Sequence, residues 1–193
     1  MQKPNNYSST QAASADGFSR LPAGNYVLKI MEVKDAQTKT GKPMTVISYD
    51  VAEGEHKDFY TTAYKADSRD PKKWGGVAYI VNEDKDGNCS RNFKGFTEAL
   101  ENSNPGYLIP WGDNAGPSMK GKLIGAQMRD EEYLTNKGEY RMSAKVAYWA
   151  SVEDIRNGKC KELTPKYIDR SAESESTGFM SVPDSIDDEL PFK

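Results

Sequence analysis

Cysteine and histidine are scarce in this chain of 193 residues, which contains two cysteines and one histidine. Cys89 and Cys160 are far apart in the sequence and show none of the close spacing found in zinc sites. With His56 as the only imidazole, the sequence predicts no metal site, and nothing else in it calls for a cofactor. So few cysteines fit a reducing compartment, and we expect the protein to be cytoplasmic.

Long hydrophobic runs are also absent. No apolar stretch approaches the ~20 residues that a membrane-spanning helix needs, and Met1–Thr10 has no apolar stretch typical of a secretion signal. Hydrophobic residues make up 36% of the chain, which together with 16 glycines lies just under the usual range for globular proteins. We therefore expect no membrane association, and a small core with sizeable polar loops or tails.

Catalytic motifs are missing as well. The sequence has no glycine-rich phosphate loop followed by Lys-Ser/Thr and no GxSxG nucleophile motif. Asp130, Glu131 and Glu132 are consecutive, so a strand would point them to opposite faces. His56 has no recognisable serine or cysteine partner. The sequence therefore favours a binding protein over an enzyme.

Short β-branched runs bounded by turn residues predict a mainly β protein. One helix is predicted from Phe93, Phe96, Ala99 and Leu100, which share a helical face. The predicted elements are strands at Asn25–Val33, Pro43–Val51 and Lys57–Tyr64, a short apolar piece at Val77–Val81, the helix at Asn92–Glu101, strands at Lys120–Leu134 and Glu139–Ala150 joined by a hairpin turn at Asn136–Gly138, and a helical turn at Asp154–Asn157.

This order of elements is that of an OB-fold, a five-stranded barrel with a helix between strands three and four. Residues 65–119 would form a long elaboration within it, and a β-sandwich is the alternative. We expect a flexible segment at 1–19, the OB domain at 20–168 and a disordered acidic tail at 169–193. Seven acids and two bases give the tail a charge of −5, and since the whole chain carries −3, residues 1–168 carry +2.

Aromatic and cationic residues are interleaved along the predicted domain. A surface that binds single strands needs both, because rings stack on bases and cations follow phosphates. Successive side chains of a strand point to opposite faces, so Arg141, Lys145 and Trp149 of the fifth strand are expected on one face, the outer one. The other set on that strand is Tyr140, Met142, Ala144, Val146 and Tyr148, which we assign to the core; Tyr26, Phe59, Phe93 and Phe96 are also expected there. The candidate nucleic-acid contacts are Lys39, Lys42, Tyr60, Tyr64, Lys65, Arg69, Lys72, Lys73, Trp74, Trp111, Arg141, Lys145 and Trp149.

The C-terminal residues form a second candidate site. An acidic run precedes an apolar end, and such a segment has too few apolar groups to fold alone. Docking on a partner would bury the apolar end, while the acids steer it toward a basic rim. The candidate partner-binding residues are Asp187, Asp188, Glu189, Leu190, Pro191 and Phe192. This ending resembles the tails of bacterial and phage single-strand DNA-binding proteins, although there the phenylalanine is terminal and here Lys193 follows it.

Segments of the predicted domain resemble OB-fold single-strand DNA-binding proteins of phages and mobile elements, which are encoded near recombination and replication genes. The segments are Leu21–Tyr26, Thr40–Met44, Tyr49–Gly54, Asn92–Phe96 and Glu101–Asn104. The resemblance implies sequence-independent binding of single-stranded DNA in replication or recombination, with the tail recruiting partner proteins. Homo-oligomerisation is left open. The alternative is an OB or sandwich module that binds protein or glycan.

Overall fold

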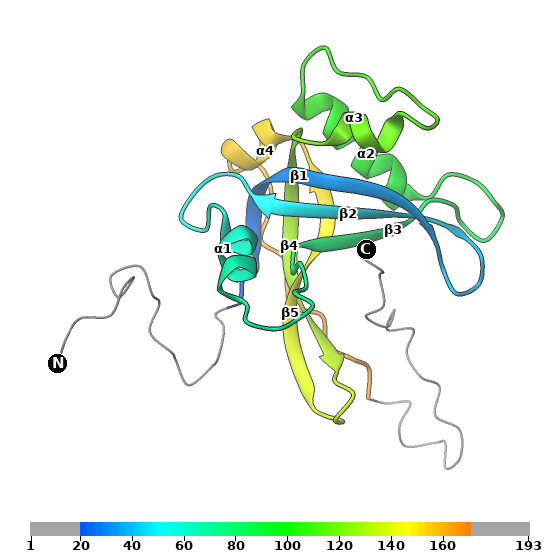
Figure 1. Ribbon diagram of the computed structural model, residues 1–193. Coiled ribbons are helices and arrows are strands. Elements are labelled where there is room, and N and C mark those ends of the chain that lie inside the picture. The colour runs from blue at the N-terminus through cyan, green and yellow to red at the C-terminus, as the bar shows by residue number, and fades with distance from the viewer. Residues whose placement is uncertain (1–19, 171–193) are drawn as a thin grey trace.

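The computed structural model describes residues 20–170, which form one antiparallel sheet of five strands and four helices (Figure 1). The strand order is β3-β2-β1-β4-β5. The mainly β class is confirmed. The elements are β1 (Gly24–Gln37), β2 (Pro43–Val51), α1 (Phe59–Ala66), β3 (Val77–Val81), α2 (Arg91–Ser103), α3 (Ala115–Met119), β4 (Leu123–Leu134), β5 (Tyr140–Ala150) and α4 (Val152–Arg156).

Strand β1 belongs to both halves of the sheet. Its first residues, Gly24–Lys29, pair with β4, and the remainder, from Leu28 onward, pairs with β2. The register shifts between Ile30 and Glu32, and such a bulge bends a strand and increases its twist. In Figure 1, β1, β2 and β3 accordingly run across the view while β4 and β5 run steeply downward. Within residues 20–170 no ladder joins the edge strands β3 and β5, so the sheet is open.

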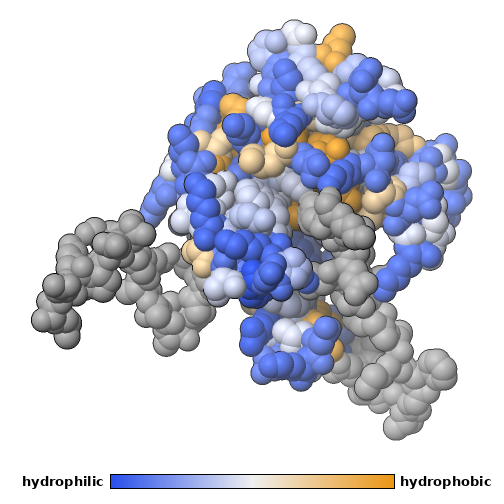
Figure 2. Space-filling model, in the orientation of Figure 1, coloured by the Kyte–Doolittle hydropathy of each residue, from blue (hydrophilic) through white to orange (hydrophobic). Residues whose placement is uncertain are grey.

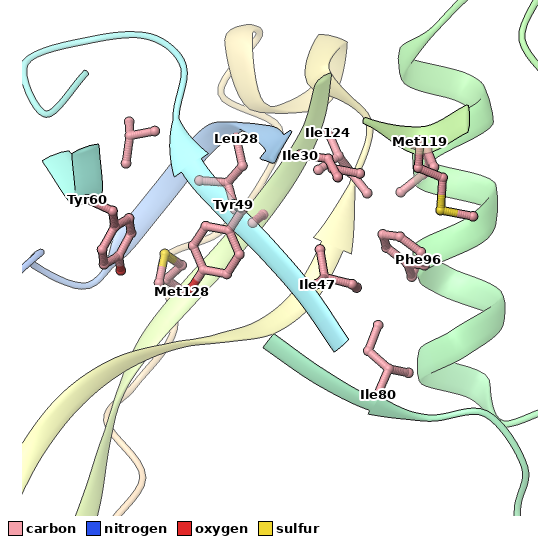
Figure 3. Close-up of a cluster of buried hydrophobic side chains, with 14 of the residues drawn as sticks. Leu28, Ile30, Ile47, Tyr49, Tyr60, Ile80, Phe96, Met119, Ile124 and Met128 are labelled. Carbon is pink, nitrogen blue, oxygen red and sulfur yellow. The ribbon is translucent and has the colours of Figure 1, made fainter. Parts of the chain in front are cut away.

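The core lies between the inner face of this bent sheet and α2 (Figure 3). Helix α2 contacts β3, β4 and β5, so it packs against both edge strands. Its Phe96 and Leu100 are fully buried, and burial of each such side chain contributes roughly 1.5–3 kcal/mol. Ser90 caps the helix by accepting a hydrogen bond from the Phe93 N–H at 3.2 Å. The helix predicted at Asn92–Glu101 is confirmed.

The predicted third strand is wrong, because Phe59–Ala66 forms helix α1 and the third strand is Val77–Val81. The reason lies on β2. The buried carboxylate of Asp50 accepts hydrogen bonds from the backbone N–H groups of Val51, Tyr60 and Thr61 at 2.8, 2.9 and 2.9 Å. The first N–H groups of a helix have no partner within it, so a carboxylate placed there stabilises the helix start. Because Asp50 belongs to β2, the sequence of the helix itself gives no sign of this contact.

The faces assigned to β5 are correct from Arg141 to Val146 and wrong beyond Val146. Val146 pairs with Met128 and Tyr148 with Gln127, so one extra residue, Ala147, is inserted between them. An extra residue reverses the alternation of side chains that follow it. Trp149 therefore packs into the core, with its ring 5.2 Å from that of Phe96, while Tyr148 is 53% exposed. Tyr140, at the start of the strand, was also assigned to the core but is 37% exposed.

The chain after α4 runs beside the outer part of β4. The Glu132 N–H donates to the Lys166 carbonyl and the Lys166 N–H donates to the Asp130 carbonyl, each at 2.8 Å. Arg170 pairs with Glu132 at 2.7 Å, so structural contacts continue past the expected boundary at residue 168. The segment at 1–19 and most of the expected tail, including the candidates Asp187–Phe192, lie outside the described residues.

Candidate nucleic-acid interface

Six of the candidate contacts gather on α1 and the loop that follows it. We call this set the α1 surface; it consists of Tyr64, Lys65, Arg69, Lys72, Lys73 and Trp74. The Tyr64 and Trp74 rings are 5.7 Å apart and tilted by 50°. The Lys72 ammonium lies 5.7 Å from the centre of the Tyr64 ring and donates to the carbonyls of Tyr64 and Lys65, both at 3.4 Å. A cation is favoured there both by the ring and by the carbonyl end of the helix.

Trp74 anchors the loop of the α1 surface. Its ring is half-buried against the core, and its Nε1–H donates to the Tyr49 carbonyl at 3.1 Å. The Tyr49 N–H in turn donates to the Gly76 carbonyl at 2.8 Å, which extends the β2–β3 ladder back toward Trp74. Only glycine fits at position 76, because a Cβ there would lie 2.2 Å from the Tyr49 oxygen. Trp74 therefore offers only part of its ring to a ligand, and Tyr64, 38% exposed, is the more accessible ring.

Two acids, Asp67 and Asp70, lie in the segment that carries the α1 surface, and Asp67 is neutralised by a cation of that surface. Arg69 binds Asp67 through its guanidinium, with contacts of 2.8 to 3.1 Å to both carboxylate oxygens. These hydrogen bonds, together with the Arg69 N–H, hold the pKa of Asp67 at about 2. The segment 64–74 contains four cations and two acids, so its net charge is +2. This part of the molecule can attract a polyanion.

Tyr60 does not belong to this surface, so its assignment as a stacking residue is wrong. It is 8% exposed, and its ring meets those of Tyr49 and Phe59 edge-on at 5.6 and 5.2 Å. Burial, with the nearby negative charge of Asp50, raises the pKa of Tyr60 to about 12, although a hydrogen bond with Tyr49 acts in the opposite direction. Tyr60 contributes to the core, as Figure 3 shows.

A ring that the sequence reading missed lies on the outer face of β3. Tyr79 is 44% exposed, and it pairs with Val46 of β2, which pairs in turn with Lys34 of β1. Neighbouring strands are about 4.8 Å apart, so Tyr79 and Lys34 stand on one face two strand spacings from each other. The alternation of side chains in Val77–Val81 is the sequence signal that places Tyr79 on the outer face, once this segment is recognised as the third strand.

The turn joining β1 to β2 carries Lys39 and Lys42, both exposed as expected. The Thr38 N–H closes this turn by donating to the Lys42 carbonyl at 2.9 Å. Lys42 also lies near Asp84, whose pKa is lowered by the N–H groups of Asn88 and Asp86 and by the Lys42 charge. These lysines therefore mark the end of the β1–β2 ladder beside the loop between β3 and α2.

The outer face of the β4–β5 hairpin carries further candidates. Arg141 and Lys145 are exposed, and Arg141 pairs with Glu139 at 2.8 Å. Lys145 lies opposite Arg129, and the exposed Tyr148 was not among the candidates. In Figure 1 the hairpin extends below the rest of the domain, and Figure 2 shows this end as mostly hydrophilic. The hairpin thus projects from the rest of the domain and carries cations and an exposed tyrosine ring of its own.

Trp111 is not brought to the α1 surface. It is 67% exposed in the loop between α2 and α3, with its ring 6.2 Å from that of Phe93. Figure 1 places α3 at the top of the domain and α1 at the left, so the two regions lie on different sides. The thirteen candidates therefore form separate groups.

A pocket of 680 Å³ lies between β1, β2 and the start of α1. Its lining combines cations, such as Lys29 and Lys57, with acids, including Glu53 and Asp58. Glu53 is already paired with Arg156. Among residues 20–170, no group of three histidine, cysteine, aspartate or glutamate side chains could hold a metal ion. No helix in the same range has the length and apolar composition needed to cross a membrane.

Comparison with known proteins gives one family match. A family model described as "Protein of unknown function (DUF669)" matches residues 6–66, which include β1, β2 and α1. The match ends where the loop carrying Arg69, Lys72, Lys73 and Trp74 begins. No curated protein matches the chain.

Proposed function

We propose that this protein binds single-stranded DNA without sequence preference, in the replication or recombination of a phage or mobile element. The observation that carries the proposal is the α1 surface, where the accessible Tyr64 ring and part of Trp74 lie among four cations. Stacking of a base on such a ring is worth about 1–3 kcal/mol and tolerates any base, while the cations follow the phosphates.

The arrangement of the sheet supports an OB-type domain. The order β3-β2-β1-β4-β5, with α2 between β3 and β4, accords with the chain order of that fold. OB domains grip nucleic acid on the face of strands two and three and with the neighbouring turns. Tyr79, Lys39 and Lys42 occupy those positions here. The C-terminal residues Asp187–Phe192 would recruit replication or recombination proteins.

Binding of a fluorescently labelled oligo-dT, followed by anisotropy at several salt concentrations, tests the proposal. Tyr64→Ala should weaken binding about 5- to 150-fold, because it removes one stacking ring worth ~1–3 kcal/mol. The matched control is Tyr167→Ala, which removes an equally large ring that is 65% exposed and far from α1 in the sequence. Wild-type affinity should fall steeply with added salt.

Two results would overturn the proposal. Wild-type protein that fails to bind oligo-dT at low salt would leave the alternative, a module that recognises protein or glycan. Equal affinities for the Tyr64 and Tyr167 variants would move any DNA-binding site away from the α1 surface.

A further inference from the structure

The pocket between β1, β2 and the start of α1 plays no part in the proposed function. Its volume of 680 Å³ lies within the range of about 300–1,000 Å³ that is typical of sites for small ligands. The sheet brings charged and apolar lining residues together, because Lys29 on β1 pairs with Asp50 on one side and with Leu123 on the other. Directly paired residues project on the same face of a sheet, so these three side chains stand side by side.

Asp58 lines the same pocket in an unusual backbone conformation. Among residues 20–170 it is the only non-glycine residue with a positive φ, and its φ and ψ are 58° and 27°. Such a conformation is uncommon, although aspartate and asparagine tolerate it better than most residues. The Asp58 side chain does not cap the helix, because the Asp50 carboxylate accepts the N–H groups of Tyr60 and Thr61. The Asp58 carboxylate is therefore left for another partner.

Two cations of the lining are also left for a ligand. Within residues 20–170, neither an ion pair nor a side-chain hydrogen bond holds Lys29, Lys57 or Asp58. The other acids of the lining are already engaged, since Glu53 is paired with Arg156 and the buried aspartate accepts backbone N–H groups. The pocket thus offers one carboxylate and two ammonium groups.

We infer that this pocket binds a guanine base. Guanine carries two adjacent donors, N1–H and N2–H₂, beside the acceptor O6. A carboxylate accepts two parallel N–H donors at once, which adds geometric specificity as well as strength, and an ammonium donates to O6. Asp58 supplies the carboxylate, and Lys29 or Lys57 supplies the ammonium. Met31 and Leu123 of the same lining provide apolar surface for the ring.

The other DNA bases do not match this set of groups. Thymine has a single N–H between two carbonyls, and cytosine and adenine each have one amino group beside an acceptor nitrogen. Each of these bases can donate only one strong hydrogen bond to a carboxylate and turns an acceptor toward its second oxygen, which is repulsive. The Asp58 carboxylate therefore selects guanine.

The guanine can belong to a free nucleotide or to a DNA strand. Thr61 also lines the pocket, and it lies one helical turn before Tyr64 and Lys65 on the same face of α1. The pocket therefore borders the α1 surface, and a strand bound there can place one base in it. The inference itself does not depend on DNA binding, because a free nucleotide carries the same base.

Isothermal titration calorimetry of the full-length chain with dGMP, dAMP, dCMP and dTMP tests the pocket. Wild-type protein should bind dGMP about 5- to 150-fold more tightly than the other three, as one bidentate contact predicts. Asp58→Asn keeps the side-chain size and tolerates the same backbone conformation, but its amide loses one acceptor, so this preference should be lost. The matched control, Asp35→Asn, changes an exposed aspartate of β1 outside the pocket and should retain the preference.

Glycine at position 58 separates binding from folding. Glycine adopts a positive φ without steric cost, so Asp58→Gly should unfold at the same urea concentration as wild-type protein or at a higher one. The same variant should lose the preference for dGMP, because it has no carboxylate.

Fluorescence anisotropy with oligo-dT containing one central guanine, compared with plain oligo-dT, identifies the source of the base. A gain in affinity that disappears in Asp58→Asn identifies the strand, and a preference confined to dGMP identifies a free nucleotide. Failure of plain oligo-dT to bind would count against the proposed function alone, since the titration with dGMP stands without it. The inference is overturned if neither assay shows a preference for guanine, or if that preference survives in Asp58→Asn.

Discussion

Replacement of Asp50 should destabilise the protein more than its position on a strand would suggest. Its carboxylate is 3% exposed and accepts three backbone hydrogen bonds, two on Oδ1, from Val51 and Tyr60, and one on Oδ2, from Thr61. Asp50→Ala would leave all three N–H groups without this acceptor. A buried donor that loses its partner costs about 1–3 kcal/mol. Asp50 also lines the pocket, so water can reach part of the site and reduce this loss.

The expected loss for Asp50→Ala is therefore about 2–5 kcal/mol, a large share of a typical total stability of roughly 5–15 kcal/mol. Asp50→Asn keeps one carbonyl oxygen that can take the place of Oδ1, so it should retain two of the three bonds. It loses the third bond and the favourable interaction of a negative charge with the helix start. We expect a smaller loss of about 1–2 kcal/mol for Asp50→Asn.

Urea unfolding followed by circular dichroism measures both values, with the exposed Asp35→Ala on β1 as the control. The control should change the free energy of unfolding by less than about 0.5 kcal/mol. The reasoning is refuted if Asp50→Ala costs no more than the control. It is also refuted if Asp50→Asn is as damaging as Asp50→Ala, since the order of the two follows directly from which oxygen accepts which N–H.

Two further predictions test the core and the sheet. The pKa of Tyr60 is about 12 in the folded protein and near 10 in the unfolded chain, so the unfolded state releases the proton first as pH rises. The free energy of unfolding should therefore be unaffected below about pH 10 and should fall by up to roughly 3 kcal/mol toward pH 12. Urea unfolding across that range should show a smaller fall for Tyr60→Phe, and an undiminished fall would assign the effect to other groups. Trp149→Ala should cost about 3 kcal/mol because its ring packs on Phe96, while Lys145→Ala should cost less than about 0.5 kcal/mol. The reverse order, measured by thermal or urea unfolding, would place Trp149 outside the core and contradict the inserted residue in β5.

Periodicity in the sequence was sufficient for most of the sheet. Strands β1, β2, β4 and β5 and helix α2 all lie where alternation or helical spacing predicted them. The failures have physical causes that local patterns do not contain. The start of α1 is stabilised by Asp50, a residue on β2, and the face of Trp149 depends on a single inserted residue, Ala147. Both effects are tertiary, so propensity and spacing were overridden.

The candidate site, like the fold, could be predicted only in part from the sequence. Lys65, Arg69, Lys72 and Lys73 are close in sequence and remained close in the fold, so their grouping could be predicted from the interleaved residues alone. Tyr79 could not be chosen without the correct third strand. Trp111 was selected for its residue type, and only the structure separates it from the α1 surface.

The α1 surface and the stability of the domain depend on the same contacts. Helix α1 has eight residues, too few to be stable alone in water. It is positioned by the Asp50 carboxylate at its start, and the following loop is positioned by the Trp74 hydrogen bond and by Gly76. None of these three residues offers a fully accessible side chain to a ligand. Substitution of any of the three should therefore weaken oligo-dT binding by displacing Tyr64 and its neighbouring cations. In a double variant with Tyr64→Ala the losses in binding free energy should not add, because both substitutions remove the same contact between the Tyr64 ring and the DNA.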